Sequence, residues 1–243
     1  WYGMYAGLIN VEQRRPSKNF NCFVNRMDPN RQSWLYLLIR RGLFDQGFIS
    51  FNMDISRHLM LKEYPPGTTP MEVFENQFEK YCNIFSDEHR ILKNKVPYKN
   101  FDSDTSPVEI IMDSKFSIVL ETYHDDNRFI TLSEKIFRCL KLPRPWVLHA
   151  EKSAVAYIRN MGFDVLDDVV DHSYDDIDFT IERQSAILDQ CEKLSLLDIP
   201  LIQQRLIDAA NHNQKILDLF YKTWFEDFDK SVSKALSLSK KEY

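Results

Sequence analysis

The chain has 243 residues, of which 44% are hydrophobic and 28% charged, and only 6 are Gly. This balance is typical of a packed globular protein and excludes disordered and collagen-like chains. The formal charge of −5 provides no general attraction to polyanions, so charge does not support a nucleic-acid partner or acceptor.

The cysteine and histidine positions argue against a metal site. The four cysteines are far apart and form no CxxC pair, which favours reduced thiols over a zinc site or a dense disulfide framework. No two of the six histidines have the i, i+4 spacing that places two metal ligands on one helical face. The sequence also contains no run of about 20 apolar residues, so we expect no membrane span.

The first predicted elements form a strand, a loop, a helix and a second strand. Lys18–Val24 combines aromatic and β-branched residues and precedes a loop rich in Asn, Asp and Pro. A helix is predicted over Gln32–Arg41, with Gly42 as its C-cap, and a second strand over Phe48–Asn52. This order is typical of one α/β unit.

The next stretch loses clear periodicity. Pro65, Pro66 and Pro70 predict a loop, and Met71–Phe85 is predicted to be a helix. We interpret residues 56–101 as an insertion or connecting region.

Strand-forming runs return with Val108–Asp113 and Phe116–Glu121. The second run is continuous enough to be buried on both faces, as in a parallel sheet. A helix over Ile136–Leu140 and a buried strand over Trp146–His149 are predicted to follow.

Shorter elements come next along the chain. Ser153–Met161 is predicted to be a helix that Gly162 ends, and residues 163–166 look like a short strand. Two charged helices are then predicted over Ile177–Leu196 and Pro200–Leu238.

The predicted fold class is α/β, with a Rossmann-like parallel sheet, helices on both faces and a helical C-terminal region. The predicted division is the end of an N-terminal region or domain at 1–17, the sheet domain at 18–180 and C-terminal helices packing back on it at 181–243.

Ligands of open parallel sheets bind at the loops that follow the carboxyl ends of the strands. The loop after the Phe116–Glu121 run contains Glu121 and His124, and the next helix opens with Ser133, Glu134 and Lys135. A capping Ser, a Lys cation and a Glu that accepts hydrogen bonds from ribose hydroxyls together suit a nucleotide diphosphate. The alternative is that these residues only cap a helix and that the Lys is a solvated charge.

The loop after the first strand is a second candidate for phosphate contact. It contains Asn25, Arg26 and Arg31, and Arg makes planar bidentate contacts with phosphate. In the alternative, these arginines pair with surface carboxylates. The Asp-rich stretch 164–178 does not have the EF-hand spacing and is predicted to be a solvated loop.

Glycine fingerprints for nucleotide binding are absent from the sequence: there is no GxGxxG, GxxxxGK[ST] or GxSxG. Dinucleotide-binding, P-loop and α/β-hydrolase readings therefore lose their main support. A phosphate-binding α/β domain without such fingerprints remains, and sugar-nucleotide transferases are one class of this kind.

Two segments resemble a known family. The run FITLSEKIF at 129–137 and the stretch RPWVLHAEKSAVAYIRNMGFDVLDD that begins at Arg144 resemble the C-terminal nucleotide-binding domain of GT-B glycosyltransferases. The similarity is to the fucosyltransferase-like branch with its phage and giant-virus relatives. Ser133 replaces the Thr of the family's Thr-Glu-Lys motif, whereas Glu134 and Lys135 match it.

The resemblance implies roles for particular residues. Glu134 and Lys135 would contact the ribose and phosphates of the donor, and Arg26 or Arg31 a phosphate. Glu121 corresponds to the family's acidic strand end, where it or His124 would orient the sugar or assist proton transfer.

The expected function is transfer of a sugar from a GDP- or UDP-activated donor to a hydroxyl of a glycan or other acceptor, with no obligatory metal. The alternative is a non-catalytic binding or assembly module that keeps the same fold. The expected location is the cytoplasm, that of the host if the protein is viral.

Overall fold

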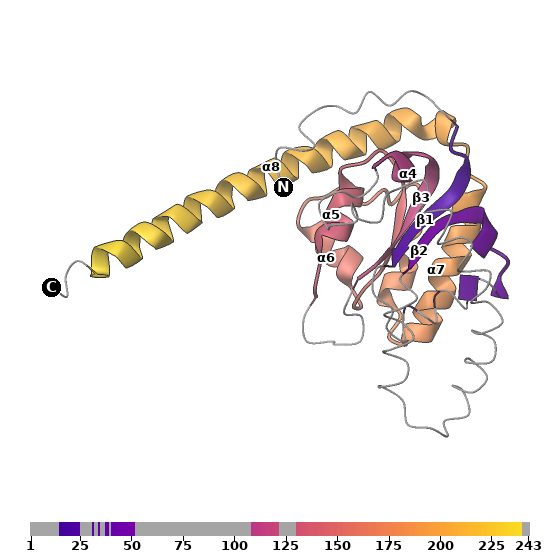
Figure 1. Ribbon diagram of the computed structural model, residues 1–243, viewed down its shortest axis with the longest axis horizontal. Helices are drawn as coiled ribbons and strands as arrows, with labels where there is room; N and C mark the ends of the chain where they lie inside the picture. The colour runs from indigo at the N-terminus through magenta and orange to yellow at the C-terminus, as the bar shows by residue number, and fades with distance from the viewer. Residues whose placement is uncertain are drawn as a thin grey trace, which may run out of the picture.

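The computed structural model describes residues 15–24, 31, 34, 37, 38, 40–51, 108–121 and 130–239. The predicted helix at 71–85 and the predicted insertion at 56–101 lie outside these residues. The centre of the described part is a four-stranded sheet in which every neighbouring pair of strands is parallel (Figure 1).

The strands are β1 (Lys18–Val24), β2 (Gly47–Phe51), β3 (Ser114–Leu120) and β4 (Trp146–His149), in the spatial order β2-β1-β3-β4. All four were predicted from the sequence within one or two residues. The chain adds β2 on one side of β1 and then crosses to add β3 on the other side. This reversal is the topological switch point of a doubly wound sheet, and it is consistent with the predicted Rossmann-like class.

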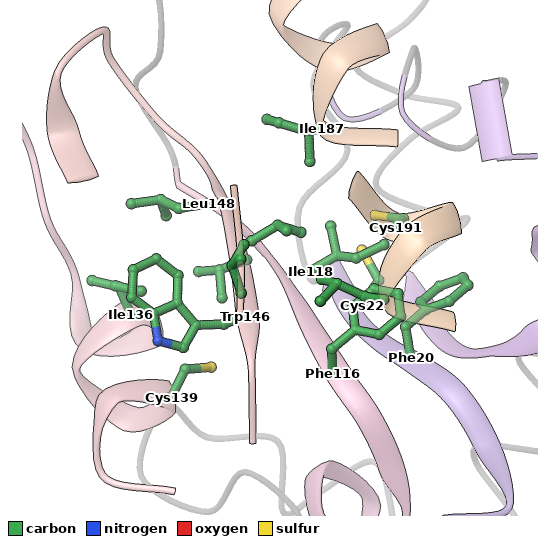
Figure 2. Packing of buried hydrophobic residues seen from close by; sticks show 14 of the residues in the cluster. Phe20, Cys22, Phe116, Ile118, Ile136, Cys139, Trp146, Leu148, Ile187 and Cys191 are labelled. Carbon is green, nitrogen blue, oxygen red and sulfur yellow. The ribbon is translucent and has the colours of Figure 1, made fainter. Parts of the chain in front are cut away.

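The strands are apolar because both faces of the sheet are covered. Figure 1 shows α5 (Glu134–Leu140) and α6 (Ala154–Asn160) on one side and α7 (Thr180–Ser195) on the other. The core fills both interfaces, and Figure 2 shows Trp146 beside Cys139 of α5 and Cys22 beside Cys191 of α7. A strand buried on both faces cannot alternate polar and apolar residues, which explains the continuous apolar runs.

The run at 108–113 was wrongly predicted to be a strand. It forms α4 (Val108–Met112), and Asp113 continues the turn by donating its N–H to the carbonyl of Glu109. Ile110 and Ile111 are buried, whereas Glu109 is exposed. Short apolar β-branched runs do not distinguish helix from strand by periodicity, and a parallel crossover into β3 favours a helix.

The predicted short strand at 163–166 was also wrong. Leu166 has a φ of 62°, which no strand residue adopts. The carboxylate of Asp164 accepts the N–H of Leu166 at 2.9 Å, so the side chain closes a local turn. Asp favours such turns, which compete with strand pairing.

The predicted helices from 134 to 238 are present. Ser133 caps α5 by accepting the N–H of Lys135, and Gly162 follows α6 with a φ of 93°, as predicted. Residues 31, 34, 37, 38 and 40 are helical, within or next to the predicted helix. Two short 3-10 helices, η2 (Phe44–Gln46) and η4 (Ser173–Asp176), complete the described elements.

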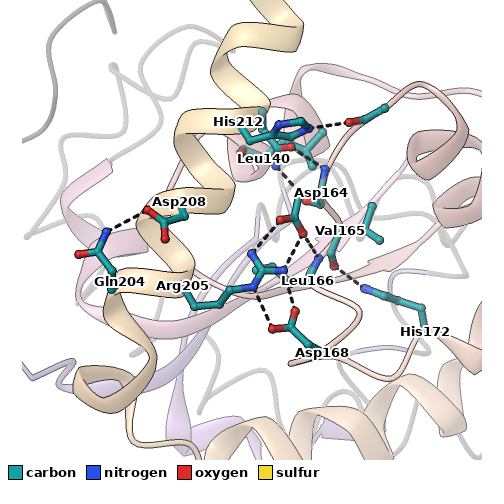
Figure 3. A network of polar contacts seen from close by, with 12 residues as sticks. Leu140, Asp164, Val165, Leu166, Asp168, His172, Gln204, Arg205, Asp208 and His212 are labelled. Carbon is teal, nitrogen blue, oxygen red and sulfur yellow. Dashed lines mark hydrogen bonds and ion pairs between the residues drawn. The ribbon is translucent and has the colours of Figure 1, made fainter.

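The last helix, α8 (Ile199–Ser239), has 41 residues and packs on α5. Asn213 of α8 is buried, and its amide donates to the carbonyls of Leu140 and Asp164 and accepts the N–H of Asp164. Arg205 forms ion pairs with Asp164 and Asp168 at 2.7 Å (Figure 3). No helix in the described part of the chain is long and apolar enough to cross a membrane.

The prediction of a solvated Asp-rich loop at 164–178 was wrong for Asp175, which is buried, whereas Asp167 and Asp168 are exposed to solvent as predicted. Asp164 and Asp168 bind Arg205, and Asp167 binds Arg159 at 2.6 Å. The carboxylate of Asp175 is buried and accepts the N–H of Ala156. The stretch attaches α8 and α6 to the domain.

Gly47 lies where β2 meets the ring of Phe20. A Cβ atom at this position would be 2.3 Å from a ring carbon of Phe20, which is buried and packs against Phe116. We expect Gly47→Ala to lower the free energy of unfolding by about 1–3 kcal/mol through overpacking. Urea unfolding would show a smaller loss when Gly47→Ala is combined with Phe20→Leu, and equal losses in both backgrounds would contradict the clash.

The Arg205 network predicts a pH-dependent contribution to stability. Burial alone would raise the pKa of Asp164, but hydrogen bonds from Arg205 and from the N–H of Leu166 lower it overall. A lowered carboxyl pKa stabilises the fold above the unfolded pKa, and this contribution is lost as the pH falls through the folded pKa.

Arg205→Met should therefore cost about 1–2 kcal/mol at pH 7 and progressively less below about pH 4. Arg159→Met is the matched control, because its pair with Asp167 is more exposed and should contribute about 0.5 kcal/mol. Urea unfolding across this pH range measures both variants. An equal cost of the two at pH 7 would show that Arg205 does not anchor α8.

Candidate functional site

The candidate site lies at the carboxyl edge of the sheet, beside the switch point between β1 and β3. Glu121 follows β3 directly, and Glu151 comes two residues after β4. Both side chains are buried, with exposed fractions of 1% and 2%. Ligands of open parallel sheets bind at this edge, so the two buried carboxylates mark the candidate site.

Glu121 binds the segment that opens α5. One carboxylate oxygen accepts the N–H of Ser133 at 3.0 Å, and the other accepts the Ser133 hydroxyl at 2.6 Å. The structure thus joins two of the predicted site residues. A buried carboxylate is costly unless it is paired and hydrogen-bonded, and these contacts supply its hydrogen bonds.

Lys135 completes this cluster. Its Nζ donates to the Ser133 hydroxyl oxygen at 3.0 Å and lies 3.6 Å from carboxylate oxygens of Glu121 and Glu134. The side chains of Lys135 and Glu134 are 28% and 29% exposed, so both can reach solvent. The predicted residues 133–135 and Glu121 therefore form one group, with a buried anion beneath a partly exposed cation.

Arg31 reaches the same edge from the segment after β1. It is 4% exposed, and its Nη2 donates to the backbone carbonyl of Glu121 at 3.5 Å. This contact places a buried guanidinium across the switch point from β1 to β3. The other predicted residues of these loops, Asn25, Arg26 and His124, lie outside the described residues.

Glu151 is a candidate that the sequence analysis missed. One carboxylate oxygen accepts the N–H of Thr131 at 3.4 Å, and the other is buried without a hydrogen-bond partner among the described residues. Burial raises the pKa of Glu151, and the charge of Glu121 also raises it. The available signal was position, because Glu151 follows a predicted buried strand as Glu121 does.

Helix α7 contacts the loop that carries Glu151. Arg183 is buried and donates to the carbonyls of Ala150 and Ile177. Ser153 has a φ of 64° and donates its N–H to the carbonyl of Asp175. These contacts hold the backbone of the turn from β4 into α6. The position of Glu151 in this turn is therefore fixed by backbone hydrogen bonds on either side of it.

This arrangement can bind an anion at Lys135, close to a carboxyl group with a raised pKa, Glu151. Lys135 offers a positive charge at the surface, and Glu134 offers acceptors to hydroxyl groups. Behind them are the hydrogen-bonded carboxylate of Glu121 and Glu151, whose pKa burial raises. No family model, characterised protein or solved structure matches the chain.

A substitution of Glu151 tests whether a poorly paired carboxylate is kept at this edge. A raised carboxyl pKa means that the folded state loses stability as the pH rises past the unfolded pKa, which is about 4.3 for Glu. Glu151→Gln removes this ionisation, so it should stabilise the protein at pH 7 by about 1 kcal/mol. The gain should vanish below about pH 4, where Glu is neutral in both states.

Thermal unfolding at pH 7 and pH 4 measures this difference. Glu182→Gln is the matched control, because Glu182 is exposed in the first turn of α7, where loss of its charge should slightly destabilise the protein at pH 7 rather than stabilise it. An equal loss of stability in Glu151→Gln at both pH values would mean that the carboxylate has a purely structural role.

Proposed function

We propose that the protein is a glycosyltransferase that moves a sugar from a nucleotide-diphosphate donor to a hydroxyl of an acceptor. The domain would be the nucleotide-binding half of a GT-B type enzyme. The observation that carries the proposal is the position of Lys135, a partly exposed cation held by Ser133 over buried Glu121 at the carboxyl edge of the sheet.

Charge supports a diphosphate at this place. The leaving group of such a donor gains negative charge as the bond to the sugar breaks, and a preorganised cation stabilises that charge. The Nζ of Lys135 is fixed by its contacts with Ser133 and Glu121, so it needs little reorganisation to act. Arg31 adds a second positive charge at the same edge.

The remaining residues divide the other tasks. Glu134 is partly exposed, so its carboxylate can accept hydrogen bonds from the ribose hydroxyls. Both carboxylate oxygens of Glu121 accept hydrogen bonds from Ser133. This arrangement suits Glu121 to hold Lys135 in position rather than to transfer a proton itself. Proton transfer from the acceptor is left to His124, which is outside the described residues.

Ligand-dependent stabilisation tests donor binding. Thermal unfolding is measured with GDP, UDP, ADP, CMP and their sugar conjugates. A ligand that binds only the folded state at 100 times its Kd adds about 2.7 kcal/mol of stability. We expect one base to be selected, and Lys135→Ala to weaken its binding at least tenfold.

Lys193→Ala is the matched control, because Lys193 is an exposed residue of α7 that lies 3.9 Å from Asp171. It should leave the shift unchanged. Release of free nucleoside diphosphate with an acceptor mixture then separates an active enzyme from a binding module. The absence of any shift in folded wild-type protein would overturn the proposal.

A further inference from the structure

Helix α8 is much longer than its attachment to the domain requires. Its 41 residues correspond to about 60 Å of helix. Its first part is held by Arg205 and Asn213, and Phe220 stacks on Phe163 at 6.0 Å. Beyond this point, Figure 1 shows the helix continuing well past the sheet and its covering helices.

Length alone gives the extension little stability. The part from residue 221 to 239 has 19 residues, which is only a little above the length of about 12–15 residues below which isolated helices are marginal in water. In proteins, helical stability comes mainly from packing of an apolar face. A packing partner would therefore stabilise the extension.

The sequence of the extension contains a seam for such a partner. Apolar positions 225, 228, 232 and 235 are occupied by Phe, Phe, Val and Ala. Their alternating spacing of three and four residues is the heptad pattern of a helix that packs against another helix. Trp224 and Leu236 extend this seam at its flanks.

The seam is symmetric about residue 230. An antiparallel copy centred there would bring position 228 level with 232 of the other copy, 225 level with 235 and 224 level with 236. Every one of these positions is apolar. Such a match is what an isologous two-fold interface requires, because each position must suit its own counterpart.

The charges along the extension also suit an antiparallel copy. Residues 221–229 contain three acidic residues and one Lys, whereas residues 230–239 contain two Lys and no acidic residue. An antiparallel copy places the acidic half of one helix alongside the basic half of the other. A parallel copy would place like charges together.

We propose that α8 pairs with α8 of a second copy of this chain, antiparallel and centred near residue 230, to form a two-fold dimer. The occupant is a second copy rather than another protein because the apolar pattern and the charge pattern are both complementary to themselves. Each domain would then lie at one end of a shared helical pair, with its candidate site outside the pair.

The first experiment measures association. Light scattering after size exclusion, over a range of concentrations of the full chain, should give a dimer. Phe228→Asp should weaken dimerisation at least tenfold, because it places a charge in the seam. Thr223→Asp is the matched control, because Thr223 is exposed and lies outside the seam, and the dimer should persist.

The second experiment tests the antiparallel arrangement. Mixed Phe225→Cys and Ala235→Cys chains should form a 225–235 cross-link on oxidation. A monomer at all concentrations, or 225–225 cross-links in place of 225–235, would overturn the proposal, while circular dichroism checks that each variant keeps its helix content.

Discussion

The pairing of β1 with β3 is the constraint on which the rest of the domain depends. The central residues of both strands are buried on both faces, so a simple alternation of polar and apolar side chains does not specify their register. A buried polar contact does: Asn21 of β1 donates to the hydroxyl of Ser117, its direct partner on β3, at 3.0 Å, and to the carbonyl of Phe116. A slip by one residue would bury both polar groups without partners, which is costly.

That register decides what meets at the carboxyl edge. With β1 and β3 aligned, the segment after β1 brings Arg31 to the backbone of Glu121, and β4 aligns Glu151 one strand further on. Glu121 then recruits Ser133 and Lys135 from α5. The positions of the buried carboxylate and of the partly exposed cation thus follow from strand pairing, because the side chains that contact one another lie close together along the sheet edge.

The sheet could be predicted from the sequence because its strands are continuous apolar runs bounded by turn residues. The errors fall where a local interaction decided the backbone. Residues 108–113 suit a strand as well as a helix, and only the crossover into β3 selects the helix. Residues 163–166 have strand-like composition, but the side chain of Asp164 turns the chain at Leu166.

Within the site, Ser133, Glu134 and Lys135 were predictable because they share one helix start. Glu151 was not, because its significance depends on Thr131 and Glu121, which are 20 and 30 residues away along the chain. The ion pairs of Arg205 were missed for the same reason: they join α8 to a loop about 40 residues earlier. Contacts of this range leave no periodic trace in a sequence.

Asn213 binds the end of α5 that lies farther from the candidate site. The seven residues of α5 span about 10 Å. One end holds Lys135 in the candidate site, and the carbonyl of Leu140 at the other end is bound by Asn213 of α8. The first part of α8 and the candidate site are therefore attached to opposite ends of the same short helix.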